Sequence, residues 1–214
     1  MQKYSVFFLT AMSMVLIAVF SVRCSGVEQD GVAGTSQMPK VVTGAAGSLL
    51  KPAKPLPAFS LVDHRGEEFG PAQLAGRWSL LFMGFTSCGH LCPPTMYKMT
   101  LVQEQLGELV PELPLRILFV SVDPGRDNQL ALMDYAEGYG PDVLAVTGPA
   151  AELDALAGGL GATWRVIKDD ESYVVEHSPA LYLINPEGRF AGIFSPPLNS
   201  EKIAADIQGY IGSE

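Results

Sequence analysis

Runs of apolar residues along the chain predict buried strands alternating with helices. Residues 80–85, 115–122 and 143–146 are apolar almost throughout, as central strands covered on both faces are. Apolar side chains near helical spacing predict a helix over 95–109. Helices are also expected over 128–139 and 150–160.

Shorter patterns complete this picture at both ends of the region. Residues 59–62 followed by the turn at 63–66 predict a small hairpin, and His64 in that turn is expected at the surface. Later segments give strands at 164–167 and 173–175 around an acidic turn, a hairpin of 180–184 with 189–194, and a final helix capped by Ser200. Strands interleaved with helices predict an α/β sandwich.

The amino-terminal region has a different pattern. No charged residue occurs over the 18 positions of 5–22, so residues 1–24 are predicted to be a membrane anchor or a signal segment. The weak charge bias around this segment favours export of the rest of the chain. Cys24 directly after it leaves acylation open as an alternative, although Arg23 fits that alternative poorly.

Composition divides the remainder into a tether and a domain. Residues 25–57 are rich in Gly, Ala, Ser, Pro and Lys without a helical or strand period, which predicts a flexible linker before a domain over 58–214. The formal net charge of -9, with no basic stretch, excludes a nucleic-acid partner. Export implies an oxidising compartment in which paired thiols can oxidise.

Cys88 and Cys92 are the strongest candidates for chemistry. They lie between a predicted buried strand and a predicted helix, with three residues between them, so both thiols face one side if the segment is helical. The start of a helix lowers the pKa of nearby thiols, and thiolates suit soft ions such as Cu(I). A purely structural disulfide is the alternative, but such a short loop yields only about 2 kcal/mol.

A histidine is the natural third ligand for such a pair. His177 immediately precedes a predicted strand, and in a thioredoxin-like sandwich that segment faces the cysteine turn. A surface histidine at a strand entrance is the alternative. His90 lies between the cysteines, where it is either a further ligand or a solvated turn residue.

These residues resemble those of the Sco/SenC family, thioredoxin-fold proteins that carry copper to the CuA site of cytochrome c oxidase. Three motifs carry the resemblance: Cys88 to Pro93, the Glu176-His177-Ser178 segment, and the run from Val120 to Asp127. The segment from Leu181 to Phe190 is also similar, and the likeness extends over roughly 58–209.

The resemblance implies a thioredoxin-like sandwich with a central mixed sheet and a copper site. Cys88, Cys92 and His177 would be the ligands for Cu(I), Cu(II) or both, with Asp123, Arg126 and Asp127 lining or supporting the site. The implied partner is cytochrome c oxidase subunit II or another copper protein. The implied location is a bacterial inner membrane, with the domain facing the periplasm or the exterior.

The chain departs from the family pattern at two places. Gly89 and His90 stand where proline and aspartate are usual, and Pro179 stands where many relatives carry an aliphatic residue. Pro179 is similar in position to the cis-proline of thioredoxins, so we expect a cis Ser178–Pro179 bond and a stronger tendency to thiol exchange.

Two functions therefore compete. The first is a metallochaperone that passes copper to a partner by ligand exchange. The second is a membrane-tethered thiol–disulfide oxidoreductase that reduces the cysteines of a partner during oxidase assembly or in redox sensing. Peroxidase activity and a purely structural module are weaker alternatives.

Overall fold

The structure is a computed structural model of the protein and describes residues 38–113 and 115–213. Its strands are β1 (Lys40–Thr43), β2 (Gly47–Pro55), β3 (Leu61–Asp63), β4 (Glu68–Phe69), β5 (Trp78–Gly84), β6 (Leu115–Ser121), β7 (Val143–Thr147), β8 (Trp164–Lys168), β9 (Tyr173–His177), β10 (Leu181–Ile184) and β11 (Arg189–Phe194). Its helices are α1 (Pro71–Leu74), α2 (Cys92–Leu109), α3 (Gln129–Glu137), α4 (Ala150–Leu160) and α5 (Ser200–Ile211).

Nine of the strands form one mixed sheet in the order β1-β2-β11-β10-β5-β6-β7-β3-β4. β5, β6 and β7 are parallel, while β10 pairs antiparallel with β5 and β3 pairs antiparallel with β7. The central strands therefore end at the same edge of the sheet, and the segments that follow β5 and β6 meet there. This confirms the α/β sandwich with a central mixed sheet.

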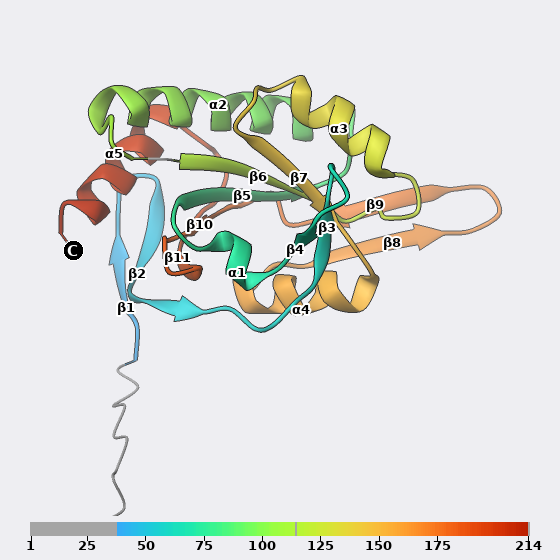
Figure 1. The fold of residues 1–214 in the computed structure, drawn as a ribbon, viewed down its shortest axis with the longest axis horizontal. Coiled ribbons are helices and arrows are strands. Elements are labelled where there is room, and N and C mark those ends of the chain that lie inside the picture. The colour runs from blue at the N-terminus through green and yellow to red at the C-terminus, as the bar shows by residue number, and fades with distance from the viewer. Residues whose placement is uncertain (1–37, 114, 214) are drawn as a thin grey trace, which may run out of the picture. The chain divides into compact units, whose positions relative to one another are not determined.

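Helices cover both faces of the sheet, with α2 and α3 on one side and α4 on the other (Figure 1). Successive side chains of β5 point to opposite faces of the sheet, which explains both layers. Leu80 and Phe82 pack into the core under α2, α3 and α5, whereas Leu81 and Met83 pack into the core under α4. Burial of each such side chain contributes about 1.5–3 kcal/mol. The rigid centre of the molecule thus lies directly behind the ends of β5 and β6.

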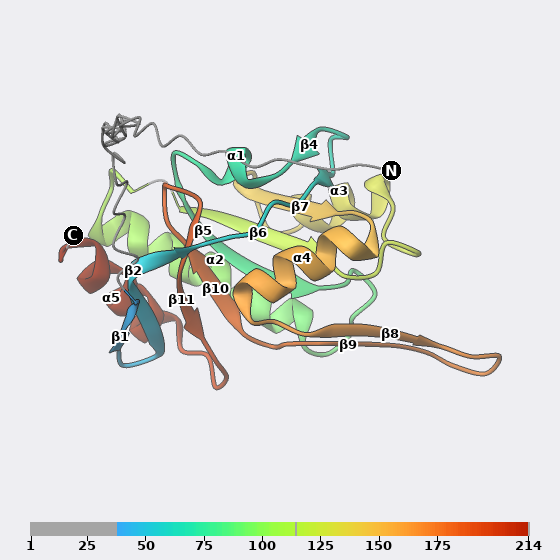
Figure 2. The same cartoon turned by 90° about the horizontal axis from the view of Figure 1, so that it is seen from below.

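β8 and β9 form a separate two-stranded hairpin, called the arm, that extends away from the sandwich (Figures 1 and 2). Its register pairs Trp164 with His177 and Lys168 with Tyr173. His177 therefore lies at the base of the arm, where the arm joins the body.

The prediction of a flexible linker over 25–57 is wrong for 40–55, which form β1 and β2. β2 pairs with β11 and buries Leu49 and Ala53 against the core. Asp206 in α5 accepts hydrogen bonds from the backbone N–H groups of Ala45, Ala46 and Gly47, which fixes the β1–β2 turn. β2 contains few apolar residues and two prolines, so its sequence does not have the pattern of a strand. Few apolar residues suffice because few of its side chains are buried.

The predicted anchor over 1–24, including Cys24, lies outside the described residues. Within 38–113 and 115–213, no helix is both long and apolar enough to cross a membrane. The other predicted elements occur within a few residues of their expected bounds. Two differ in detail: α2 begins at Cys92, and the side chain of Asn199, instead of Ser200, caps α5 by accepting the N–H of Lys202.

Candidate metal centre

The two cysteines lie where the chain leaves β5 and enters α2. Cys88 is half-buried in the connecting loop, and its backbone N–H donates to the carbonyl of Phe85 over 3.2 Å. Cys92 is the first residue of α2, and its side chain is fully buried. Both thiols are free in the structure.

The sequence of the first turn of α2 directs one backbone donor at Cys88. Helix starts leave N–H groups without partners in the helix, but Pro93 and Pro94 carry no N–H. Among the first three residues of α2, Cys92 is therefore the one with an N–H, and it donates to the Sγ of Cys88 over 3.4 Å. A thiolate at Cys88 is thus favoured by the backbone itself.

The two thiols differ in acidity. Burial alone would raise the pKa of Cys88, but hydrogen bonds from the Cys92 thiol and from the N–H groups of Cys92, Leu91 and His90 bring it below its ordinary value. Burial raises the pKa of Cys92 strongly, and its hydrogen bond to Cys88 raises it further. Cys88 is therefore the reactive thiol, and Cys92 keeps its proton until a cation or an electrophile arrives.

His177 completes the group from the base of the arm. Its Nε2 lies 3.8 Å from the Sγ of Cys92, and its Nδ1 lies 3.2 Å from the carbonyl oxygen of Ser178. A carbonyl only accepts, so Nδ1 carries the proton and Nε2 presents its lone pair to the sulfur. Burial lowers the pKa of His177, which keeps the imidazole neutral and able to bind a metal.

Two aromatic rings fix the orientation of this imidazole. Phe82 in β5 and Phe85 after it meet the His177 ring edge-on, with centroid distances of 5.5 and 5.9 Å. Such packing excludes water from one side of the ring and limits its rotation. The sulfur atoms of Cys88 and Cys92 and a ring nitrogen of His177 all lie within 4.8 Å of one another, so they can share one ion.

Asp127 holds the cysteine loop against the end of β6. This buried carboxylate accepts hydrogen bonds from the N–H of Thr86 over 2.8 Å, from the Thr86 hydroxyl over 2.6 Å and from the Ser121 hydroxyl over 2.6 Å. The neighbouring residue, Asn128, caps α3, and its side chain accepts the N–H of Ala131. Asp127 thus sets the course of the loop without belonging to the ligand group.

Asp123 and Arg126 hold the arm. The Tyr173 hydroxyl donates to the buried carboxylate of Asp123, which also forms an ion pair with Arg126. The Arg126 guanidinium lies 4.0 Å from the centre of the Tyr173 ring and 5.7 Å from that of Phe85. Sequence reasoning missed Tyr173, although its position four residues before His177 puts both on one face of β9.

Two other predicted residues lie elsewhere or behave differently. His90 is exposed and lines a groove beside Cys88 and His177, outside the Cys-Cys-His group. His64, expected at the surface, is half-buried, and its Nδ1 accepts the N–H of Ala145.

The predicted cis Ser178–Pro179 bond is wrong. Among the described residues, the cis peptide bonds are Lys51–Pro52 and Pro196–Pro197. Ser178 instead continues the arm's pairing, since its N–H donates to the carbonyl of Thr163 and its hydroxyl accepts the Thr163 N–H. The Ser178–Pro179 bond thus has the trans form, which X–Pro bonds prefer by about 0.5–1 kcal/mol.

The sequence of the chain is similar to those of known proteins. Residues 49–212 match the protein family described as SCO1/SenC. The mitochondrial SCO2 homolog of Bos taurus is 35% identical over 162 residues, which are 72% of this chain and 59% of the relative. The mitochondrial SCO1 homolog of Homo sapiens is 34% identical over 155 residues, 70% of this chain and 50% of the relative. The chain thus matches between half and three-fifths of the length of these relatives.

Solved structures give the same likeness. Arabidopsis thaliana ScoI with copper bound has a TM-score of 0.69 and 25% identity, covering 74% of this chain and 98% of that one. Yeast Sco1 with copper bound has a TM-score of 0.68 and 27% identity, covering 75% and 90%.

The relatives correct one prediction. The related proteins of cattle, human and Saccharomyces cerevisiae are mitochondrial, which contradicts the predicted bacterial inner membrane and points to the mitochondrion. An apolar segment such as 5–22 indicates that a chain can insert into a membrane, but it does not indicate which membrane of the cell that is.

Proposed function

Because the chain belongs to the SCO1/SenC family, we propose that it binds one copper ion on Cys88, Cys92 and His177 and passes it to a partner. The convergence of these three donors within 4.8 Å is the observation that carries the proposal. Two sulfurs and one imidazole nitrogen suit copper, since thiolates select Cu(I) and imidazole suits either oxidation state. Copper is here the cargo of the protein.

The site favours capture and release by exchange of ligands. Cys88 is the more exposed and the more acidic of the two thiols, so it is the thiol that first contacts an incoming ion. Cys92 gives up its proton as it binds, and His177 already presents a lone pair. A partner with similar ligands can then displace the donors one at a time, without a step that requires the free ion.

The surroundings of the site support docking of a protein partner. A groove of about 420 Å³ runs beside Cys88 and His177, and Leu91, with 61% of its surface exposed, lines it. Exposed apolar side chains next to a reactive group are typical of interaction surfaces. By family likeness, we propose that the recipient is the CuA subunit of cytochrome c oxidase or another copper protein, and that the amino-terminal segment tethers the domain to a membrane.

Titration of the purified, reduced protein with Cu(I) and with Cu(II) tests the proposal. We expect one ion per chain in mass spectrometry, and Cys88→Ser, Cys92→Ser and His177→Ala should each weaken binding in competition with a chelator. His90→Ala is the matched control, because it removes an exposed imidazole two residues from Cys88. The third-ligand role is wrong if His177→Ala leaves both the Cu(I) affinity and the thiolate-to-Cu(II) charge-transfer band unchanged.

A thiol–disulfide oxidoreductase is the second candidate, favoured by the unequal acidity of the thiols. The Cys88 thiolate would attack one sulfur of a partner disulfide and release the other as a thiolate. Cys92 would then lose its proton and attack Cys88, which forms the Cys88–Cys92 disulfide and frees the second partner thiol. A dithiol donor must afterwards restore the reduced pair.

Copper-free turnover separates the two candidates. A reductase converts a disulfide substrate in the presence of a dithiol donor and a copper chelator, and loses this activity in Cys88→Ser and in Cys92→Ser. A carrier without reductase function shows no such turnover but keeps its copper stoichiometry. His177→Ala should affect the carrier function more than the reductase function.

A further inference from the structure

A second cavity lies at the amino-terminal ends of the central strands, whereas the cysteines follow the carboxyl-terminal end of β5. It has a volume of about 370 Å³, and its lining includes Arg65, Arg77 and Arg116 together with His64 and Asp142. Arg77 and Arg116 lie near the starts of β5 and β6, whereas the cysteines follow the end of β5. A strand of this length spans on the order of 20 Å, so the cavity is independent of the metal centre.

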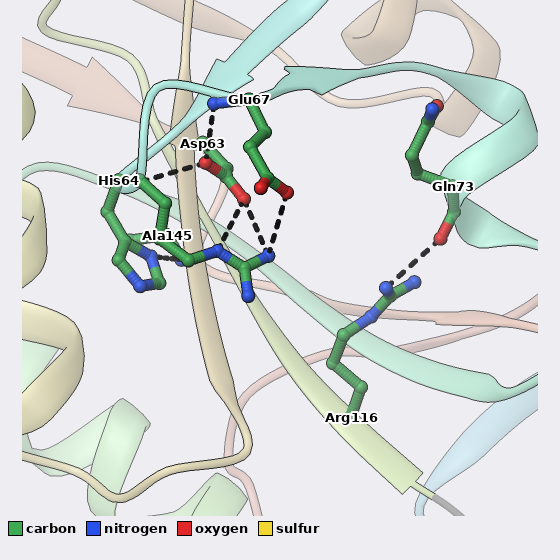
Figure 3. A network of polar contacts seen from close by, with 7 residues as sticks. Asp63, His64, Glu67, Gln73, Arg116 and Ala145 are labelled. Atoms are coloured by element: carbon green, nitrogen blue, oxygen red, sulfur yellow. Dashed lines mark hydrogen bonds and ion pairs between the residues drawn. The ribbon is translucent and has the colours of Figure 1, made fainter.

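Arg116 is the central feature of this cavity. It is half-buried, and its guanidinium is held by the Ser79 hydroxyl at 2.9 and 3.2 Å and by the Gln73 carbonyl at 3.0 Å. These are neutral acceptors, and among the residues the structure describes no carboxylate forms an ion pair with Arg116. Figure 3 shows Arg116 directed toward Gln73, with no dashed line to Asp63 or Glu67.

Two cations lie near Arg116: Arg77, and Arg65, which is paired with Asp63 and Glu67. Burial, together with repulsion from Arg77 and Arg65, lowers the pKa of Arg116 to about 10. A half-buried cation beside two like charges is unfavourable unless an anion joins it. The chain as a whole carries a net charge of -9, so this local excess of arginine is not a consequence of composition.

Hydrogen-bond donors remain available around the cavity. Arg65 uses Nε and Nη2 for Asp63, which leaves its Nη1 without a partner in the described region, and Arg77 forms no hydrogen bond or ion pair there. The Nδ1 of His64 accepts the Ala145 N–H, so its Nε2 carries a proton. The opposing charges are Asp142, which is exposed at the rim, and Asp63 and Glu67, which are engaged by Arg65.

We propose that this cavity binds an anion bearing a phosphate group. Guanidinium groups match phosphate oxygens with paired N–H donors, and several such groups from different elements suit a tetrahedral dianion. The volume falls in the range of small-ligand sites and accommodates a phosphate with a modest organic substituent. Free phosphate compounds and phospholipid headgroups share this chemistry.

The test is a titration of the purified full-length protein with inorganic phosphate at constant ionic strength. We expect saturable shifts of the backbone amide signals around Arg77 and Arg116 in NMR spectra, and about a tenfold or greater loss of affinity in Arg116→Gln. Arg77→Gln removes a side chain without hydrogen bonds in the described region and tests the site even if Arg116→Gln fails to fold. Lys202→Gln, in α5 away from the cavity, is the control for net charge.

A second arm of the experiment distinguishes the sources of phosphate. Vesicles of phosphatidylcholine with and without phosphatidic acid are mixed with the same proteins and sedimented. Binding that requires phosphatidic acid and is lost in Arg77→Gln supports a lipid headgroup, whereas saturable binding of inorganic phosphate alone supports a soluble ligand. The proposal is overturned if neither binds, or if both arginine variants bind as the Lys202→Gln control does. The proposed copper binding at Cys88 is tested separately, and none of these outcomes bears on it.

Discussion

The Sγ of Cys92 lies 3.8 Å from the Nε2 of His177, although 85 residues separate them in the chain. The contact joins the first residue of α2 to the base of the arm. It therefore depends on two structural units at once, and a change in either unit should alter copper binding.

Gly84→Ala should distort the metal centre from behind. A Cβ atom at Gly84 would lie 3.0 Å from the Sγ of Cys92, 2.9 Å from Phe119 and 3.0 Å from Phe82. Such overpacking costs about 1–3 kcal/mol of folding free energy. We expect that loss in urea unfolding, together with about tenfold weaker copper binding, as is typical when the surroundings of metal ligands are disturbed.

Gly89→Ala is the matched control for that variant. Nothing lies within 4 Å of a Cβ atom at Gly89, so the substitution adds a methyl group to open space. Stability and copper affinity should match those of the parent protein. Equal losses in both variants would contradict the packing argument at Gly84.

Tyr173→Phe should loosen His177 without touching a ligand. The variant keeps the ring beside Arg126 but loses the hydroxyl that donates to Asp123. We expect faster copper dissociation and about tenfold lower affinity, measured by stopped-flow transfer to a chelator. Tyr97→Phe, which changes an exposed tyrosine of α2, is the control. An unchanged dissociation rate in Tyr173→Phe would show that the hydrogen bond between Tyr173 and Asp123 is not needed to position the arm.

Alkylation should separate the two thiols of the reduced, copper-free protein. The pKa of Cys88 is lowered and that of Cys92 is raised, so iodoacetamide should modify Cys88 first, and mass spectrometry of peptides should identify it. The rate at Cys88 should fall as the pH drops, with a midpoint below the ordinary thiol pKa of 9.0. A faster reaction at Cys92 would reverse the assignment of the nucleophile.

Copper affinity should rise with pH. Binding displaces the proton of Cys92 and, below its pKa, that of Cys88, whereas His177 is already neutral because its pKa is lowered. Isothermal titration calorimetry in buffers of different ionisation enthalpy should therefore detect proton release. The absence of release at neutral pH would contradict a protonated Cys92.

Asp127→Asn should destabilise the cysteine loop. The carboxylate accepts three hydrogen bonds in a buried position, and an amide can accept at one of its two side-chain heavy atoms only. We expect a loss of about 1–3 kcal/mol in urea unfolding. Asp170→Asn, in the exposed turn of the arm, should change stability little, and similar values for the two would disprove the role of burial.

Local pattern allowed most of the sandwich to be predicted. The apolar runs of β5 and β6 and the helical spacing of α2 depend on neighbouring residues alone. β2 was not predicted because it contains few apolar residues. This strand is ordered by its pairing with β11, which the local sequence does not reveal. The isomer of the Ser178–Pro179 bond could not be predicted from the neighbouring residues either, because an X–Pro bond can adopt the cis or the trans form.

The site was predictable where residue type limits the chemistry. Two close thiols, a histidine and the family resemblance suffice to nominate the Cys-Cys-His group. The contact of Tyr173 with Asp123 spans 50 residues and follows from how the arm packs, which no local pattern encodes. The arginines of the second cavity come from three separate segments, so only the folded chain brings them together.

The separate pairing of β8 and β9 has a mechanical consequence. Within the described chain these strands hydrogen-bond as strands only to each other, so the arm can tilt while every rung of the main sheet stays intact. Cys88 and Cys92 belong to the body, whereas His177 belongs to the arm, whose position against the body depends on the contacts of Tyr173 with Asp123 and Arg126. For the proposed copper transfer, we expect a recipient that displaces the arm to loosen the third donor while the hydrogen bonds of the main sheet stay in place.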